Sequence, residues 1–256
     1  WNPASVPRSV WRRKSTKSDP LGRSFFICTL TILLLPVLFS YQASFTGNHA
    51  PAVKIIAPSD RTSYKAGATI PYQISVSDPE DGDSKYDEIN GKEVVLEIKR
   101  LKDNSGIKNP PGKNDPVNDP GLSFMTVSNC FNCHNFNSKS IGPSFFEISK
   151  RYPATKANID TLSSRIKNGS SGIWVKEKMP SHPELTAEQI NATVRWILKN
   201  SAVRDISYYN GLSGIIQFAP DKKGSYLLTA VYTDHGTAGE PAKHLKGFDS
   251  ITLELK

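Results

Sequence analysis

The spacing of apolar residues changes twice along the chain. Residues 94–101 alternate between two faces, with Val94, Leu96 and Ile98 on one of them, which is typical of a β-strand. Strand patterns occur on both sides of a central stretch, and they predict strands at residues 53–56, 70–76, 94–101, 215–219, 224–234 and 250–255. Between residues 122 and 200 the spacing becomes helical.

The central stretch predicts a short helix after Pro143, a second helix centred on Leu162, and a third at residues 186–200. The third helix opens with Thr186 followed three residues later by Gln189, which is the spacing of a capping box. A breaker-rich run at residues 103–121 separates this stretch from the first strands and predicts a linker.

Three strands on either side of the helices are too few for a stable sandwich, whereas six strands together supply a small two-sheet sandwich. We therefore expect an α+β multidomain chain, in which an all-α domain at residues 122–200 is inserted into an immunoglobulin-like β-sandwich. The two halves of the sandwich are residues 51–102 and 213–256. Domain insertion requires the ends of the inserted domain to lie close together. Two independent β pieces are the alternative.

The N-terminal 43 residues have a different composition. Residues 1–24 form a basic leader with six Lys and Arg residues and one acid, and residues 25–43 carry no charge. This pattern predicts a signal peptide or a membrane anchor with its basic end inside. The apolar run FFICTLTILLLPVLF (25–39) is shorter than the roughly 20 residues of a membrane span, so cleaved and uncleaved forms both stay open, with a buried core helix as a third alternative. We expect export, to the periplasm or the outer face of the inner membrane.

The net charge of +8 comes mostly from this leader, because the remaining residues carry a net charge of only +3. That charge is too small to indicate a nucleic-acid partner.

The informative cysteines are Cys130 and Cys133, which with His134 form a C-x-x-C-H motif. Two thiols at this spacing add to the two vinyl groups of haem, and the adjacent histidine is placed under the iron. The motif predicts one covalently bound haem c per chain. A structural zinc site, a thioredoxin-like redox pair and a plain disulfide are the alternatives.

Further motifs follow the haem motif in a fixed order: Ile141-Gly142-Pro143, residues 165–170 (RIKNGS), Gly172-Ile173-Trp174, Lys178-Met179-Pro180, and Trp196 in the closing helix. With these motifs, residues 122–200 resemble a class I monohaem cytochrome c of the bacterial periplasmic type. The resemblance covers about a third of the chain.

The resemblance implies a role for each of these positions. The carbonyl of Pro143 would accept a hydrogen bond from Nδ1–H of His134 and so orient this axial ligand. Arg165 and Trp174 would donate hydrogen bonds to a haem propionate. Met179 would be the sixth ligand, which makes His134 and Met179 the two iron ligands.

The methionine count supports Met179 independently. The chain has two methionines, and Met125 lies five residues before Cys130, where it cannot reach the far face of the ring. Two alternatives stay open, namely a core-packing role for Met179 and His182 as a rival ligand. The loop at residues 175–178 is more charged than is usual in the family, which leaves the surroundings of the propionate open.

These features predict an electron carrier and not an enzyme, because both axial positions are filled. The strand segments resemble, more loosely, Ig-like or PKD-like modules appended to extracytoplasmic sugar dehydrogenases. The expected partner is a redox protein, either an extracytoplasmic dehydrogenase or a terminal reductase, with membrane attachment through the N-terminal segment if it is uncleaved. The alternatives are a gas or peroxide sensor or enzyme with a labile Met179, and a glycan-binding module with an accessory haem.

Three smaller features complete the expectations. Four lysines (Lys139, Lys167, Lys176 and Lys178) either ring the haem edge or are ordinary solvated residues. The acidic segment 78–83 is either a solvated turn or a Ca²⁺ site. Tyr226 resembles the tyrosine of a tyrosine corner.

Overall fold

The structure is a computed structural model that describes residues 47–101, 111–174, 176–237 and 243–256. The basic leader and the apolar run at residues 25–39 lie outside these residues, so the signal peptide or anchor stays a prediction. Contacts divide the chain at residue 43, and all described residues belong to the second unit, Ser44–Lys256. In the described part of the chain, no helix is long and apolar enough to cross a bilayer.

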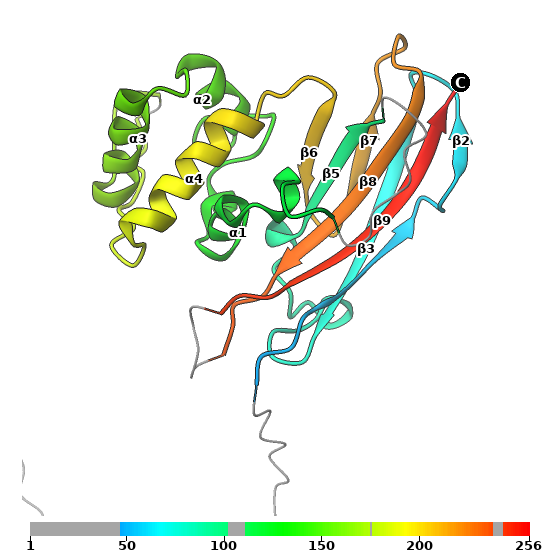
Figure 1. Cartoon of the computed structure of the whole chain (residues 1–256), viewed down its shortest axis with the longest axis horizontal. Coiled ribbons are helices and arrows are strands. Elements are labelled where there is room, and N and C mark those ends of the chain that lie inside the picture. Colours follow the sequence, from blue (N-terminus) through cyan, green and yellow to red (C-terminus); the bar gives the residue numbers. More distant parts are fainter. Residues whose placement is uncertain (1–46, 102–110, 175, 238–242) are drawn as a thin grey trace, which may run out of the picture. The chain divides into compact units, whose positions relative to one another are not determined.

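The strands of the described residues form two sheets (Figure 1). The 4-stranded sheet contains β1 (Ala52–Ala57), β3 (Thr69–Asp78), β4 (Gly82–Asp83) and β7 (Ser213–Gln217). The 5-stranded sheet has the order β2 (Thr62–Tyr64), β9 (Lys246–Leu255), β8 (Gly224–Thr233), β5 (Val95–Arg100) and β6 (Ile206–Asn210). The β2–β9 pair is parallel and the other pairs are antiparallel.

A shared apolar core lies between the two sheets. Every second residue of β3 is buried, among them Ile70, Ile74 and Val76, because successive side chains of a strand point to opposite faces. These residues pack in one cluster with residues of the other sheet, including Leu96 of β5 and Leu228 of β8. Strands from before and after the helical stretch therefore contribute to one core.

Strand β6 was not predicted from the sequence. It pairs with β5 along its whole length and begins seven residues before residue 213, where the second group of strands was predicted to start. Its five residues, ISYYN, lie between Asp205 and Gly211, which both have positive φ. A segment this short shows too few alternations of apolar and polar residues to be recognised as a strand from the sequence.

The described residues of the central stretch form four α-helices: α1 (Pro120–Val127), α2 (Phe145–Arg151), α3 (Lys156–Asn168) and α4 (Ala187–Asn200). Short 3-10 helices lie at Ser84–Tyr86, Gly91–Glu93, Pro116–Asn118 and Cys130–Asn132. The capping box predicted for α4 is confirmed: Gln189 N–H donates to Thr186 Oγ1 at 3.3 Å, and Thr186 N–H donates to Gln189 Oε1 at 2.8 Å.

The predicted linker differs from the structure in its last residues. Val117 is 1% exposed, and the carbonyl of Pro116 accepts a hydrogen bond of 2.9 Å from Nε1 of Trp196 in α4. Helix α1 begins at Pro120, with the side chain of Asp119 as its cap. The prolines in this segment thus start helical turns as well as interrupting the strand pattern.

A second core joins the helices to the sheet. Val95 of β5 and Val231 of β8 pack with Phe136, Trp196 and Tyr208 in one cluster. The alternation of residues 94–101 placed Val95 on the face opposite the sandwich core. That face is buried under the helical segment.

The predicted tyrosine corner is wrong. Tyr226 packs edge-on against Phe218 with ring centroids 4.8 Å apart. Its buried hydroxyl has no hydrogen-bond partner among the described residues, whereas a tyrosine corner needs a bond from this hydroxyl to the backbone.

Candidate functional site

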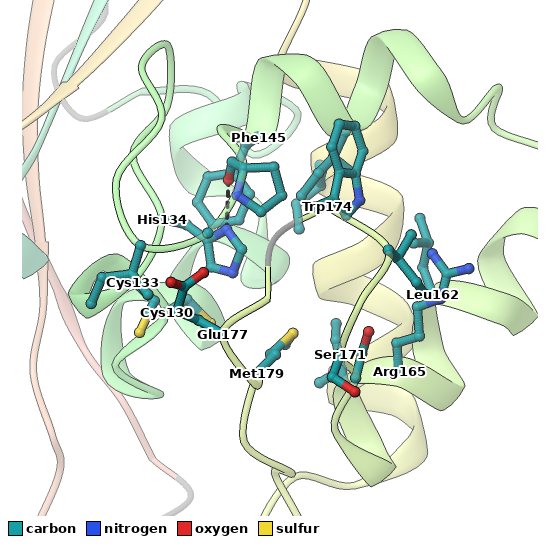
Figure 2. Close-up of a pocket in the computed structure, with 18 of the residues that line it drawn as sticks. Cys130, Cys133, His134, Phe145, Leu162, Arg165, Ser171, Trp174, Glu177 and Met179 are labelled. Atoms are coloured by element: carbon teal, nitrogen blue, oxygen red, sulfur yellow. Dashed lines mark hydrogen bonds between the residues drawn. The ribbon is translucent and has the colours of Figure 1, made fainter.

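A hollow in the helical segment brings the motif residues together (Figure 2). Its volume is about 1020 Å³ when the space open to solvent is counted, and its walls include residues of α2, α3, α4 and the loop before α4. Its apolar lining consists of Ile141, Phe145, Ile148, Leu162, Ile166, Ile173, Val194 and Ile197. A hollow of this kind suits a large, flat, mostly apolar group.

Cys130 and Cys133 lie on one short turn at the edge of the hollow. Their spacing is fixed by backbone bonds from Cys133 N–H and His134 N–H to the carbonyl of Cys130, at 3.2 and 3.0 Å. The two thiols are free, so the disulfide alternative finds no support. Burial raises the pKa of the Cys130 thiol to about 12, opposite to the low pKa of a thioredoxin-like pair.

The zinc alternative also lacks a ligand set. Among the described residues, no group of three or more His, Cys, Asp or Glu side chains is arranged to hold a metal ion. A structural zinc site needs four such ligands.

His134 is held by its neighbours on two sides. Its Nδ1 lies 2.6 Å from the carbonyl oxygen of Pro143, and its ring stacks on Phe145 with centroids 5.2 Å apart. Burial lowers the pKa of His134, and the bond to Pro143 opposes this shift. Burial therefore favours the neutral imidazole, and because Nδ1 is engaged, Nε2 is the nitrogen left for a metal.

Gly142 allows this arrangement. A Cβ on Gly142 would lie 2.5 Å from Cε1 of His134, so a side chain at this position would collide with the imidazole. The Gly142 N–H donates to the carbonyl of Cys133 at 2.8 Å, which closes the loop after the motif.

Met179 reaches the hollow from a different segment (Figure 2). Its backbone exchanges two hydrogen bonds with Ser170, of 2.8 and 3.1 Å, which hold the loop against the end of α3. Gly169 fits there because its φ is +79° and because a Cβ would lie 2.8 Å from the Met179 carbonyl oxygen. Met125 does not line the hollow and lies fully buried between α1 and the sheet.

The rival ligand His182 also lines the hollow. Its backbone N–H donates to the carbonyl of Ile166 at 3.0 Å. Its Nδ1 pairs with Oε1 of Glu184 at 2.8 Å. The structure thus brings both candidate sixth ligands to one hollow, with His182 already engaged by a carboxylate.

Arg165 and Trp174 lie together in the wall of the hollow, and each contacts a residue that the sequence did not single out. Arg165 Nη1 donates to the hydroxyl of Tyr152 at 2.9 Å. The guanidinium of Arg151 lies 4.5 Å from the ring centroid of Trp174, which is a cation–π distance. Arg151 is the last residue of α2, and Tyr152 is its C-terminal cap just before Pro153. The sequence pattern around these two residues does not indicate a binding pocket.

The four lysines behave differently from one another. Lys167 Nζ donates to the carbonyls of Pro183 and Leu185, both at 2.9 Å, so it fastens the loop before α4. Lys178 lines the hollow beside Glu177, and Lys139 and Lys176 are exposed. Lys167 therefore acts as neither a free rim lysine nor an ordinary solvated one, and the choice between these two interpretations stays open for the other three lysines.

The carboxylates of Asp78 and Asp81 in the acidic segment 78–83 accept hydrogen bonds, some from within the segment and some from outside it. The Asp78 carboxylate accepts the N–H groups of Glu80 and Asp81 at 2.9 and 2.7 Å. The Asp81 carboxylate accepts the Tyr232 hydroxyl and the His235 N–H. These hydrogen bonds favour a turn over a Ca²⁺ site for this segment.

The donor set of the hollow fits a haem c. It offers two free thiols on one turn, an imidazole oriented through Nδ1, a thioether on a separate loop and an apolar lining. This combination of helices and donors defines the class of c-type cytochromes.

The sequence comparisons with known proteins agree. The sequence model of the family described as "Cytochrome c" matches residues 119–201. Cytochrome c-552 of Hydrogenobacter thermophilus is 31% identical over 86 residues, which are 30% of this chain and 87% of that protein. Cytochrome c-551 of Azotobacter vinelandii is 36% identical over 78 residues, which are 30% of this chain and 94% of that protein. The crystal structure of Nitrosomonas europaea cytochrome c552 matches with 30% identity and a TM-score of 0.29, covering 30% of this chain and 95% of that one.

Through residues 119–201 this chain belongs to the cytochrome c family. Members of this family bind one covalent haem c per domain and carry electrons.

Proposed function

We propose that this chain is an exported electron carrier whose single haem c is attached through Cys130 and Cys133. The observation that carries the proposal is the hydrogen bond of 2.6 Å between His134 Nδ1 and Pro143 O, at the edge of a hollow that also contains Met179. This bond leaves Nε2 as the nitrogen that would hold the haem iron, and Met179 would supply a sulfur donor from a second segment.

The haem supplies the redox chemistry, because its iron alternates between ferric and ferrous states when it is bound. The chain supplies attachment, ligation and exclusion of water. His134 and Met179 are the proposed iron ligands. Pro143 fixes the tautomer of His134 and raises its basicity, as partners of metal-ligating histidines generally do. A thioether ligand favours the ferrous state and hence a relatively high reduction potential.

Arg165 and Trp174 are the proposed propionate-binding residues. Both line the hollow, and both carry N–H donors that suit a carboxylate. Tyr152 holds the guanidinium of Arg165, and Arg151 covers the Trp174 ring. These contacts reduce the rotamer freedom of the two donors before a propionate binds.

The rim of the hollow suits a protein partner. Ile141 and Ile173, which line the hollow, are exposed large apolar residues, at 53% and 37%. Lys139 and Lys178 add positive charge near them, which would steer a partner with an acidic rim in a salt-dependent manner. We propose a redox protein as this partner, either an extracytoplasmic dehydrogenase or a terminal reductase.

We propose further that the cytochrome domain is inserted into an Ig-like β-sandwich. In support, β5 and β6 flank the domain in sequence and pair with each other in one sheet. The ends of the inserted segment therefore lie close together, as domain insertion requires. Export to the periplasm or the outer face of the inner membrane is part of the proposal, since residues 1–24 are basic and the uncharged residues 25–43 contain an apolar run.

A haem-stained denaturing gel tests the covalent attachment. The variant Cys130→Ala/Cys133→Ala should lose the stain, because thioethers survive denaturation and axial bonds do not. Cys28→Ala is the matched control and should keep it. Stain that persists in the double variant would refute the attachment.

A further inference from the structure

Glu97 of β5 is a buried carboxyl group between the sheet and the cytochrome domain. It is 2% exposed and points to the same face of the sheet as Val95, which packs against the helical segment. Its partners across the sheet are Tyr208 of β6 and Thr229 of β8. A carboxyl group is rarely this buried without a partner.

The two lysines near Glu97 already interact with other groups. Lys99, on the same strand, lies 3.2 Å from Oδ1 of Asp115. Lys246 of β9, which is half-buried, donates to the carbonyls of Asn118 and Asp119 at 2.9 and 3.4 Å.

The remaining neighbours of Glu97 add no positive charge. The Tyr208 hydroxyl interacts with the Glu97 carboxyl, yet neither this hydroxyl nor Glu97 Oε2 makes a well-formed hydrogen bond among the described residues. From β8, the residues on this face are Thr229 and Val231, which are uncharged. Ionised Glu97 therefore has no dedicated countercharge.

A chain of ring contacts connects this position to His134. Tyr208 lies 5.2 Å from Phe136, measured between ring centroids, Phe136 lies 6.0 Å from Phe145, and Phe145 lies 5.2 Å from His134. The space between Glu97 and the hollow is thus filled with aromatic side chains. Charges separated by such an apolar interior are screened less than charges separated by water.

We propose that Glu97 is a redox-linked protonation site of the cytochrome domain. When the haem gains an electron, the protonation balance of Glu97 shifts, so that a fraction of the chains takes up one proton from solvent and releases it when the electron leaves. In those chains the added proton offsets the added charge of the interior, which lowers the electrostatic cost of reduction. This inference rests on the proposed electron-carrier function.

The titration range of Glu97 supports the proposal. Burial raises the pKa of Glu97 to about 7, against the smaller opposing effects of Tyr208 and Lys99. Both protonation states are therefore populated near neutral pH, where a change of haem charge shifts the balance between them.

The test is spectroelectrochemical titration of the haem-loaded chain between pH 5.5 and 8.5. The midpoint potential of the wild type should fall as the pH rises through about 7. An interaction through an interior of effective dielectric constant near 20 gives about a fivefold change in the redox equilibrium constant, or about 40 mV. Glu97→Gln should remove this part of the pH dependence, whereas Glu254→Gln, a control on the same sheet whose carboxylate is bonded to Ser225, should keep it.

Redox-difference infrared spectroscopy gives a second readout. The wild type should gain the carbonyl stretch of a protonated carboxyl group upon reduction at pH 7, and Glu97→Gln should not. Identical potential-against-pH curves for wild type and Glu97→Gln would overturn the proposal while leaving the electron carrier intact. Absence of covalent haem or of a reversible potential would instead overturn the proposed function.

Discussion

The ring of Phe136 packs against the ring of Tyr208, with centroids 5.2 Å apart and planes inclined by 31°. Phe136 follows His134 by two residues, and Tyr208 belongs to β6 of the sheet. The next residue, Asn137, donates from Nδ2 to the backbone carbonyl of Tyr208 at 2.9 Å. The segment that carries the proposed axial ligand is therefore fastened to the β-sheet.

Removing the Tyr208 ring should loosen this attachment. We expect Tyr208→Ala to lower the free energy of unfolding by about 3–5 kcal/mol, because it leaves a cavity between Phe136 and Trp196. Tyr208→Phe should be close to neutral, since the hydroxyl has no well-formed hydrogen bond to lose. Urea unfolding measures both variants. Tyr86→Ala is the control because Tyr86 is 67% exposed, and an equal loss in this control would contradict the assignment.

A side chain on Gly142 should disturb the proximal histidine. In Gly142→Ala the new Cβ would lie 2.5 Å from Cε1 of His134, so either the imidazole or the loop has to move. We expect a lower yield of haem-loaded protein and an altered ferric absorption spectrum. Gly47→Ala is the control, because no atom lies within 4 Å of the position of its Cβ. A Gly142→Ala spectrum identical to the wild type would count against His134 as the ligand.

The two methionines give a matched pair of substitutions. Met179→Leu should abolish the far-red sulfur-to-iron band of the ferric protein, lower the midpoint potential and allow ready binding of CO. Met125→Leu should change none of these, because Met125 lies in the core between α1 and the sheet. If the band survives in Met179→Leu, another residue is the sixth ligand, and His182 is the first to test.

The buried Glu97 should make stability depend on pH. Its folded-state pKa of about 7 lies above the ordinary value of 4.5, so the folded state holds this proton more tightly than the unfolded state. The resulting stability is fully present below about pH 4.5 and is lost as the pH rises through about 7. Glu97→Gln should therefore match the wild type near pH 4.5 and exceed it by up to about 3 kcal/mol at pH 8.

Urea unfolding of the wild type and Glu97→Gln across this pH range measures the difference. Burial lowers the pKa of Lys246 to about 8, so this lysine begins to titrate only at the upper end of the pH range, and its effect is common to both proteins. A constant difference from pH 4.5 to pH 8 would show that Glu97 is not the titrating group.

The local features of this protein were readable from the sequence because they depend on neighbours along the chain. The Thr186 capping box joins residues three positions apart. The bond between His134 and Pro143 spans nine residues and follows from a motif that the family shares. The long strands were visible because one face of each lies in the sandwich core, which imposes a period of two.

Contacts between distant segments were decided by the tertiary structure. Alternation assigned Glu97 to the face opposite the sandwich core, and only the packing of Tyr208, Phe136 and Trp196 shows that this face is buried as well. Arg151 and Tyr152 contact Trp174 and Arg165 in the wall of the hollow only because the end of α2 meets α3 and the loop after it. The sequence alone determined the haem motif and the helices that support it, since these are short-range patterns. The packing of the sheet against these helices depends on side chains that lie tens of residues apart in the chain. The burial of Glu97 between the sheet and the helices depends on the same contacts. Burial by such distant side chains leaves no periodic signal in the sequence.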